Sequence, residues 1–383
     1  MIEISEEPTE SAEALQLFRD SVRAFLRDEW VPQQSRWRVQ HRPDAEAWTR
    51  AGAVGLLLPD VPEIFGGGGG TFAHEAVVLE ELARAGVAFG NTVQSVVAHY
   101  LLAYGTDEQK RAWLPRMARG DLVAAMAMTE PDAGSDLQGI STSARRDGDA
   151  YVINGSKTFV TNGWHAGLIC VVVKTTPGSR APRSLSLIMV ETERLAGYRV
   201  GRTLAKIGRQ GQDTCELSFD DVRVPAANLL GGTEGAGFAQ LMEQLPYERL
   251  SVAVSAAASA EEAVASTIQY TKERSAFGKP LFEMQNTRFV LAQCHSDAQV
   301  GRAFVDRCVQ RFVEGRLDPT EAAMAKYWLT DCEHRVADAC LQLHGGYGYM
   351  DEYPIAHRWA DSRVQRIYSG ANELMKEIIA WSL

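Results

Sequence analysis

The sequence lacks long hydrophobic runs. Among its 383 residues no stretch of eighteen is continuously apolar, and the N-terminal MIEISEEPTESAE is acidic and has no hydrophobic core of a signal peptide. We therefore expect neither a membrane span nor secretion. Basic charge is also scarce, because 39 Lys and Arg against 49 Asp and Glu leave a formal net charge of -10. This balance argues against nucleic acid or an anionic membrane as a partner and favours small molecules.

Paired cysteines and common catalytic motifs are missing as well. The six cysteines are scattered without a C-x-x-C pair, which argues against a disulfide framework or a zinc site and favours reduced thiols that pack in a core. We therefore expect a cytoplasmic protein without a metal site, and a mitochondrial matrix protein that has lost its targeting segment stays open. Ser/His/Asp spacing, G-x-x-x-x-G-K-[ST] and H-E-x-x-H do not occur, so hydrolase, kinase and metalloenzyme functions lose ground.

Composition and apolar periodicity predict an α+β chain of three domains. With 45% hydrophobic and 23% charged residues, the chain is long enough for two or three domains with sizeable cores. Residues 1–125 place apolar side chains at intervals of three and four, which predicts an N-terminal helical domain. Residues 126–235 alternate and are β-branched, which predicts a central β-domain. The helical period returns over 236–383 and predicts a C-terminal four-helix bundle.

Two glycine-containing stretches are interpreted locally. FGGGGGT, Phe65 to Thr71, has no dinucleotide-binding spacing and follows no convincing strand, so we interpret it as a flexible loop. AYVINGSKTFV has an Asn-Gly pair between two β-type runs, which is the common signal of a hairpin turn.

Three motifs could contact a polar ligand, and each has a plainer reading. TEPDAGSD (129–136) offers hydroxyls and backbone N–H groups, but it is equally an Asx or ST turn. KTFVTNG (157–163) puts an aromatic and a threonine on one strand face, which is more often a half-buried strand. ERSAFGKPL (273–281) holds Arg274 and Phe277, a charge and an aromatic plate for a phosphate-bearing cofactor, or else a solvated arginine and a core phenylalanine.

Two further motifs lie near the C-terminus. LQLHGGYGYMDEYP (341–354) is a helix that runs into a Gly-Gly break, where backbone can approach a ligand closely. His344 in it could act as a base, but a lone histidine at a helix end is more often a packing or capping residue. RIYSGANELMKE (366–377) is a glycine turn that leads into a final helix.

Nearly the whole chain resembles the acyl-CoA dehydrogenase family. The resemblance depends on the α-β-α order of the segments and on five motifs that occur in this order: TEPDAGSD, INGSKTFVTNG, ERSAFGKPL, QLHGGYGY and IYSGANE. The resemblance implies an acyl-CoA substrate, FAD held at a subunit interface, electron-transfer flavoprotein as the electron acceptor, and a homo-oligomer, usually a tetramer built as a dimer of dimers. It also implies flavin binding without a Rossmann fingerprint. By matching motif positions, the implied FAD-binding residues are Met128, Thr129, Ser135, Phe159, Thr161, Arg274, Phe277, Gln285, Gln342, Gly346 and Asn372.

The catalytic base is implied less directly. Many members carry it as the Glu of an IYEGT-like motif, but this chain reads IYSGA, and the hydroxyl of Ser369 is a poor acceptor for an α-proton at neutral pH. A minority, including the isovaleryl-CoA and long-chain acyl-CoA dehydrogenases, keep the base on a helix of the C-terminal domain, at a position that matches Glu248 in LPYERL. Taken alone, Glu248 would be an ordinary helix start, since Pro246 and acidic residues suit a first helical turn. The complementary change at position 369 instead favours Glu248 as the base.

The resemblance further implies the reaction: α,β-dehydrogenation of an acyl-CoA thioester to a trans-2-enoyl-CoA, with the backbone N–H of Ser369 and a ribityl hydroxyl of FAD on the thioester carbonyl. Burial should raise the pKa of Glu248 and Arg249 should lower it, and the sequence does not say which effect is larger. Ala371 and Glu373 depart from the Thr and Gln of many members, so a hydroxyl contact near the FAD phosphates is lost. An acyl-CoA oxidase, a dehydrogenase of carrier-bound acyl groups and a non-catalytic flavin-binding protein stay as alternatives.

Overall fold

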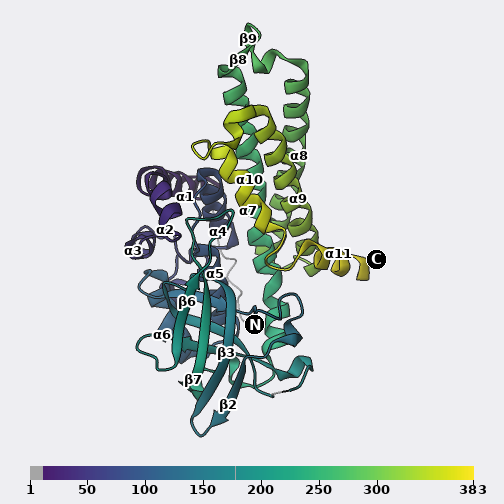
Figure 1. Ribbon diagram of the computed structural model, residues 1–383. Helices are drawn as coiled ribbons and strands as arrows, with labels where there is room; N and C mark the ends of the chain where they lie inside the picture. The colour runs from purple at the N-terminus through teal and green to yellow at the C-terminus, as the bar shows by residue number, and fades with distance from the viewer. Residues whose placement is uncertain (1–11, 177) are drawn as a thin grey trace, which may run out of the picture.

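The computed structural model describes residues 12–176 and 178–383, so most of the acidic N-terminal stretch lies outside the described residues. Three bodies follow one another along the chain: helices beside the bundle, a twisted sheet at one end of the molecule, and a long helical bundle (Figure 1). This arrangement confirms the predicted α+β fold. No helix among the described residues is long and apolar enough to cross a membrane.

The N-terminal helices pack around a cluster of aromatic side chains. Trp30, Trp37 and Trp48 are buried there, and the rings of Trp30 and Trp48 lie 4.2 and 4.3 Å from that of Phe89. Threonine caps start two of these helices by accepting a backbone N–H, as the first turn of a helix requires. The helices are α1 (Ala12–Phe25, continued by a π-helical turn over Leu26–Trp30), α2 (Gln34–Gln40), α3 (Ala45–Ala53), α4 (Phe72–Ala85), α5 (Asn91–Tyr104) and α6 (Asp107–Ala118).

The glycine-rich loop before α4 is held by backbone hydrogen bonds and is not flexible. The N–H groups of Gly68, Gly69 and Gly70 donate to the carbonyls of residues 58, 61 and 59. A Cβ at Gly67 would come within 2.2 Å of the Val61 carbonyl oxygen, so the backbone approaches its neighbour too closely for a side chain. The loop was predicted correctly, but its flexibility was not, because only the fold brings residues 58–61 against it.

The central sheet has the strand order β1-β4-β2-β3-β7-β6, with β5 paired to β4. Its strands are β1 (Val123–Ala127), β2 (Ser143–Asp147), β3 (Ala150–Thr161), β4 (Ala166–Lys174), β5 (Leu185–Glu191), β6 (Tyr198–Thr203) and β7 (Thr214–Pro225). The Asn154-Gly155 pair is not a hairpin turn, because β3 continues through it. The pairing of β3 with β7 shifts register there, and Gly155 takes a φ of 146° that favours glycine, so the pair forms a β-bulge.

The C-terminal bundle is built on α7 (Gly237–Glu273), which extends from beside the sheet to the far end of the molecule (Figure 1). Small buried side chains along its middle, among them Ala256, Ala257 and Ala260, let neighbouring helices approach closely. Pro246 lies inside this helix and not in its first turn, so the helix-start reading of Glu248 is wrong. The other elements are β8 (Ser275–Ala276), β9 (Lys279–Pro280), α8 (Gln285–Val313), α9 (Pro319–His344), α10 (Pro354–Gln365) and α11 (Asn372–Trp381).

Candidate active site

Glu248 is a buried acid in the middle of α7. Only 8% of the residue is exposed, and the hydroxyl of Tyr100 on α5 donates a hydrogen bond of 3.2 Å to its Oε1. No ion pair of this carboxylate with a Lys, Arg or His occurs among the described residues. Since an isolated buried carboxylate is costly, such a group persists for a reason other than stability.

Burial is the largest influence on the pKa of Glu248. It raises this pKa to about 7, against the hydrogen bond from Tyr100 and the positive charge of Arg249, which both lower it. The question left open by the sequence is therefore answered: desolvation outweighs Arg249. A carboxylate with a pKa near neutrality can both accept a proton and return it at physiological pH.

The turn before α11 presents a backbone N–H in an unusual conformation. Ser369 has a φ of 50° and Gly370 a φ of 90°, both in the left-handed region. Lys326 of α9 holds this turn from inside the bundle, because its Nζ donates to the Gly370 carbonyl at 2.7 Å and to Asn372 Oδ1 at 2.8 Å. Burial lowers the pKa of Lys326 to about 7. The side chain of Asn372 is thus engaged within the chain, and its predicted contact with FAD stays a prediction.

Tyr100 and Lys326 were not found by sequence reasoning. Tyr100 stands in VVAHYLLAY, an apolar helical stretch in which a tyrosine is an ordinary core residue. Lys326 stands in AAMAKYWL, where a lone lysine between apolar residues was the only signal, since such a residue is rarely buried without a partner. Their roles appear only when α5 and α9 are packed against α7.

Met128, Thr129, Phe159 and Thr161 come together where the segment after β1 crosses the end of β3. A buried ion pair fixes the crossing, with Lys157 Nζ 2.9 Å from Glu130 Oε1 and 2.9 Å from the Met128 carbonyl oxygen. The N–H of Thr158 donates to the Thr129 carbonyl. Ser135 lies farther along the same segment and is exposed.

Phe159 stands out in this group. Its backbone is left-handed, with a φ of 58°, at a register shift of β3 against β7, and 66% of the residue is exposed. A large apolar ring held outward by a bulge is costly in water and suits an apolar, planar partner. The flavin ring system fits this surface.

The other predicted FAD-binding residues lie at the far end of the bundle. Arg274 ends α7, Phe277 is at the tip of the β8–β9 hairpin, Gln285 starts α8, and Gln342 and Gly346 stand at the end of α9 and just beyond it (Figure 1). The Arg274 guanidinium lies 5.3 Å from the centre of the Tyr347 ring, and Phe277 is 95% exposed. Within one chain, α7 separates this end from Phe159.

His344 is a packing residue and not a base, and the cysteines are packing residues as well. His344 is buried and stacks on Tyr270 with ring centres 3.9 Å apart, and burial lowers its pKa to about 4, so it is a packing residue. The six cysteines are free and buried. One of them, Cys170, lies near enough to Glu248 for the acid to contribute to its raised pKa.

Comparison with known proteins gives this site its context. Models of the acyl-CoA dehydrogenase N-terminal, middle and C-terminal domains match residues 12–121, 125–222 and 235–383. The chain belongs to the acyl-CoA dehydrogenase family. Members of this family are FAD-dependent flavoproteins.

Individual acyl-CoA dehydrogenases resemble the chain over almost its full length. The mitochondrial long-chain specific acyl-CoA dehydrogenase of Sus scrofa is 44% identical over 367 residues, which are 95% of this chain and 85% of that protein. The crystal structure of an acyl-CoA dehydrogenase from Geobacillus kaustophilus superposes with a TM-score of 0.95 at 46% identity, covering 98% of this chain and 99% of that one. A chain from a structural study of the electron transferring flavoprotein of Acidaminococcus fermentans has a TM-score of 0.92 at 31% identity and covers 98% and 99%.

Proposed function

We propose that the protein catalyses FAD-dependent α,β-dehydrogenation of an acyl-CoA thioester to a trans-2-enoyl-CoA, with Glu248 as the base. The observation that carries the proposal is the buried Glu248 carboxyl, whose pKa is about 7, combined with a serine in place of an acid at position 369. A retained base on α7 explains both features at once.

In this reaction the chain holds and deprotonates the acyl group. The α C–H bond breaks and its proton goes to the Glu248 carboxylate, while the β-carbon loses a hydride and a carbon–carbon double bond forms. Bound FAD supplies the acceptor for that hydride. The Ser369 N–H, directed by the left-handed turn, donates to the thioester oxygen as negative charge develops there, and this stabilisation makes the weak α C–H acid accessible to a carboxylate.

Three side chains position these groups. Tyr100 orients the Glu248 carboxyl through its hydrogen bond, and Lys326 keeps the backbone turn in place. Arg249 is buried, and its Nε has no hydrogen-bond partner among the described residues. Its charge beside Glu248 limits the rise of the acid's pKa, so that a useful fraction of carboxylate remains at neutral pH.

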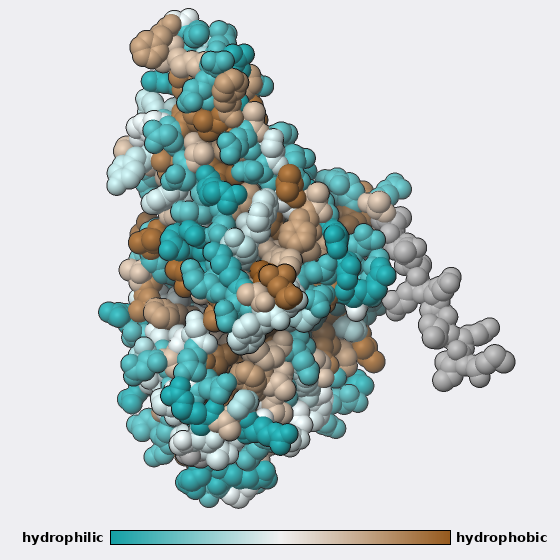
Figure 2. All heavy atoms as spheres, turned by 90° about the vertical axis from the view of Figure 1, so that its right-hand side faces the viewer, coloured by the Kyte–Doolittle hydropathy of each residue, from teal (hydrophilic) through white to brown (hydrophobic). Residues whose placement is uncertain are grey.

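The proposal includes the cofactor site and the assembly. Met128, Thr129, Ser135, Phe159 and Thr161 would hold the flavin, and the residues at the far end of the bundle would hold the FAD of a neighbouring subunit in a tetramer. Large apolar side chains exposed on the single chain support an assembly, since monomers rarely expose many (Figure 2). The most exposed are Leu383, Phe277, Tyr349, Val39 and Trp381.

Further parts of the proposal concern partners and place. We infer electron-transfer flavoprotein as the electron acceptor, a role in fatty-acid β-oxidation, and branched or long acyl chains as substrates. Buried free cysteines support a reducing, cytoplasmic location. As domain bounds we propose 1–125, 126–235 and 236–383.

The decisive experiment mixes purified wild-type and Glu248→Gln holoenzymes anaerobically with a panel of acyl-CoAs and follows flavin absorbance. We expect wild type to bleach and Glu248→Gln to bleach roughly a hundredfold to ten-thousandfold more slowly, the usual contribution of a positioned base. Glu243→Gln, which changes an exposed acid on the same helix, is the control and should behave as wild type.

Other results have defined meanings. Equal bleaching of wild type and Glu248→Gln contradicts the base assignment. Failure of wild type to bleach with any thioester contradicts the enzymatic function and favours a flavin-binding protein. Rapid oxygen consumption with acyl-CoA identifies an oxidase instead of a dehydrogenase.

A further inference from the structure

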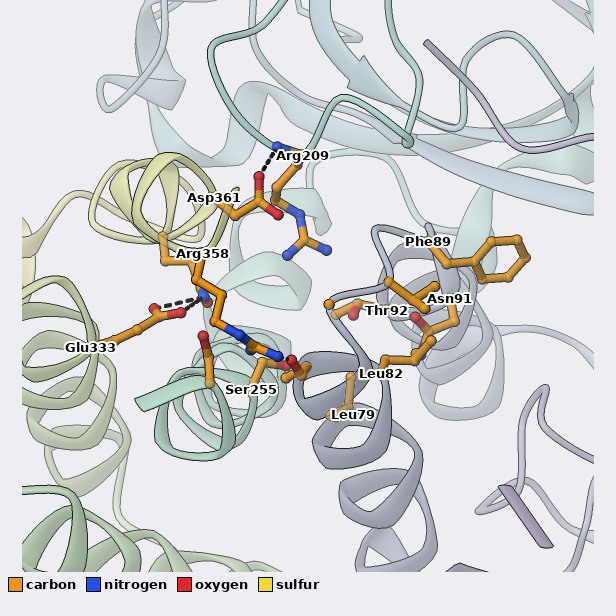
Figure 3. Close-up of a pocket in the computed structure, with 15 residues that line it drawn as sticks. Leu79, Leu82, Phe89, Asn91, Thr92, Arg209, Ser255, Glu333, Arg358 and Asp361 are labelled. Carbon is orange, nitrogen blue, oxygen red and sulfur yellow. Dashed lines mark hydrogen bonds between the residues drawn. The ribbon is translucent and has the colours of Figure 1, made fainter. Parts of the chain in front are cut away.

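A polar pocket lies between α4, α5, α7, α9 and α10, away from the flavin-facing residues (Figure 3). Its space between atoms is about 500 Å³, part of it open to solvent. One wall is apolar and includes Leu79, Leu82 and Phe89. The opposite wall carries charge and hydrogen-bonding groups: Asn91, Thr92, Arg209, Ser255, Ser259, Glu333, Arg358, Asp361 and Gln365.

Helix geometry places this pocket at a defined distance from Glu248. Tyr100 of α5 contacts Glu248 of α7, and Thr92 of α5 lines the pocket together with Ser255 of α7. Because the residue numbers fall along α5 and rise along α7 between these two places, the helices run antiparallel. Ser255 and Ser259 follow Glu248 by two and three helical turns, or about 10 and 16 Å along the axis. Buried Val252 and Val96 occupy the intervening turns, so the faces of α5 and α7 between the two sites are apolar.

The turn that carries Ser369 also adjoins the pocket. The charges of Arg209, Glu333 and Asp361 all act on the hydroxyl of Tyr368, the residue before Ser369, so these groups lie close to it. Three of the pocket residues are therefore neighbours of the catalytic turn. The pocket therefore lies two to three turns of α7 beyond Glu248 and close to the residue that precedes Ser369.

Several polar groups in the pocket have no partner in the part of the chain that the structure describes. The Arg209 guanidinium points into it (Figure 3), and among the described residues neither of its Nη atoms has a hydrogen bond or ion pair, since only its Nε is engaged, with Gln212. Asn91 is 2% exposed, and within the described part of the chain its Nδ2 has no acceptor. The first turn of α5 begins at Asn91, where free backbone N–H groups favour an anion.

The other charged side chains of the pocket already have hydrogen-bond partners within the chain. Arg358 donates to the carbonyls of Ala83 and Arg84, and Asp361 accepts the backbone N–H of Arg209. Glu333 accepts two hydrogen bonds from Gln365, and burial raises the pKa of Glu333 to about 8, so it is mainly neutral at pH 7. Among the described residues, the pocket groups without a partner are the Arg209 Nη atoms and Asn91 Nδ2, which are donors, and Gln365 Oε1, which is an acceptor.

We propose that this pocket binds the far end of the acyl chain and selects acyl-CoAs that carry a terminal carboxylate, which Arg209 and Asn91 would hold. The inference rests on the proposed function and specifies its substrate class. An extended chain advances about 1.2 Å per bond, so a span of about 10 to 16 Å from the α-carbon corresponds to roughly 11 to 15 carbons.

The test compares dodecanoyl-CoA with the mono-CoA thioester of dodecanedioic acid on wild-type, Arg209→Met and Arg199→Met holoenzymes. We expect wild type to favour the dioic thioester in kcat/KM by roughly tenfold to a hundredfold, the value of one charge-assisted hydrogen-bonded pair. Arg209→Met should abolish the preference, because the KM of the dioic thioester should rise roughly tenfold to a hundredfold more than the KM of dodecanoyl-CoA. Arg199→Met, which removes an exposed arginine of β6, should retain the preference.

A binding measurement separates this inference from the proposed function. Thioether analogues of both ligands, which cannot be dehydrogenated, are titrated calorimetrically into wild type and Arg209→Met. If neither thioester is oxidised but the dioic analogue binds more tightly only when Arg209 is present, the proposed function fails and the carboxylate subsite stands. Equal binding of both analogues, or an equal loss of both in Arg209→Met, overturns the subsite whether or not dodecanoyl-CoA is oxidised.

Discussion

At the scale of single residues, the site depends on the surroundings of one carboxyl group. Glu248 is buried in a helix interior, receives one hydrogen bond from Tyr100, and has an arginine as its neighbour in sequence. Burial raises its pKa to about 7 and the two polar neighbours restrain the rise. The consequences are measurable both in activity and in stability.

The first consequence concerns the pH dependence of activity. Because the ionised form of Glu248 is the base, kcat/KM should rise with pH through about 7. Tyr100→Phe removes a hydrogen bond that stabilises the carboxylate, so the rising limb should move to higher pH by up to about one unit. Tyr104→Phe is the matched control, since that hydroxyl donates to Glu243. An unshifted profile in Tyr100→Phe would show that this bond does not tune the base.

The second consequence concerns the free energy of unfolding. The pKa of Glu248 is 4.5 in the unfolded chain and about 7 in the folded chain, so between these pH values the folded state binds more protons. The free energy of unfolding therefore falls as pH rises from 4.5 to about 7, because the buried carboxyl must ionise. Glu248→Gln removes that loss. Its stability relative to wild type should therefore increase by about 2 to 3 kcal/mol between pH 5 and pH 8. Urea unfolding at both pH values measures it, and a pH-independent difference contradicts it.

At the scale of elements, α7 contains a proline two residues before its acid. Pro246 has no N–H to donate to the Met242 carbonyl, which costs helix stability, and a proline inside a helix usually bends the helix axis. Pro246→Ala should raise the free energy of unfolding by up to about 3 kcal/mol and lower kcat, because straightening the helix moves Glu248. Urea unfolding and single-turnover rates test both parts, with Met242→Ala as the control. A stabilised variant with unchanged kcat would rule out the bend as a device for positioning Glu248.

The turn between α10 and α11 depends on a lysine from α9. Lys326→Met keeps much of the buried volume but removes both bonds to residues 370 and 372. We expect kcat to fall roughly tenfold to a hundredfold with a smaller change in KM, because the Ser369 N–H acts mainly on the transition state. Lys272→Met, at an exposed position of α7, should match wild type. If Lys326→Arg and Lys326→Met lose the same fraction of kcat and the same amount of thermal stability, Lys326 has a purely structural role.

At the scale of the whole molecule, the predicted FAD-binding residues other than Asn372 form two groups at separate places. One group surrounds Phe159 at the end of β3, and the other surrounds Arg274 at the far end of the bundle (Figure 1). A single FAD can use both groups only if they belong to different chains. The proposed subunit interface follows from this separation.

Complementation tests that interface. Glu248→Gln and Arg274→Ala subunits are each expected to be inactive alone, the second through loss of FAD. Mixed dimers contain one site with an intact Glu248 from one chain and an intact Arg274 from the other, so random reassembly should restore about a quarter of wild-type activity. Absorbance of bound flavin and activity measure the recovery. No recovery in assemblies proven to be mixed contradicts a shared site.

The sequence by itself determined the order of helical and β segments, because apolar periods of 3.6 and 2 are local properties of the chain. The five motifs, read in order, also led to the family, and the missing acid at position 369 pointed to Glu248. The hairpin turn predicted at Asn154-Gly155 was wrong, because the pair lies in a bulge, and the alternative of a helix start at Pro246 is excluded because this proline lies inside a helix.

Only the tertiary structure decided how the site works. The pKa of Glu248 depends on its removal from water by packing of α5 against α7, and the held turn depends on a lysine 44 residues before Gly370. The Nη atoms of Arg209, which have no partner among the described residues, face a pocket lined by five helices. Desolvation and long-range pairing arise from contacts between segments far apart in the chain, so no local pattern of residues encodes them.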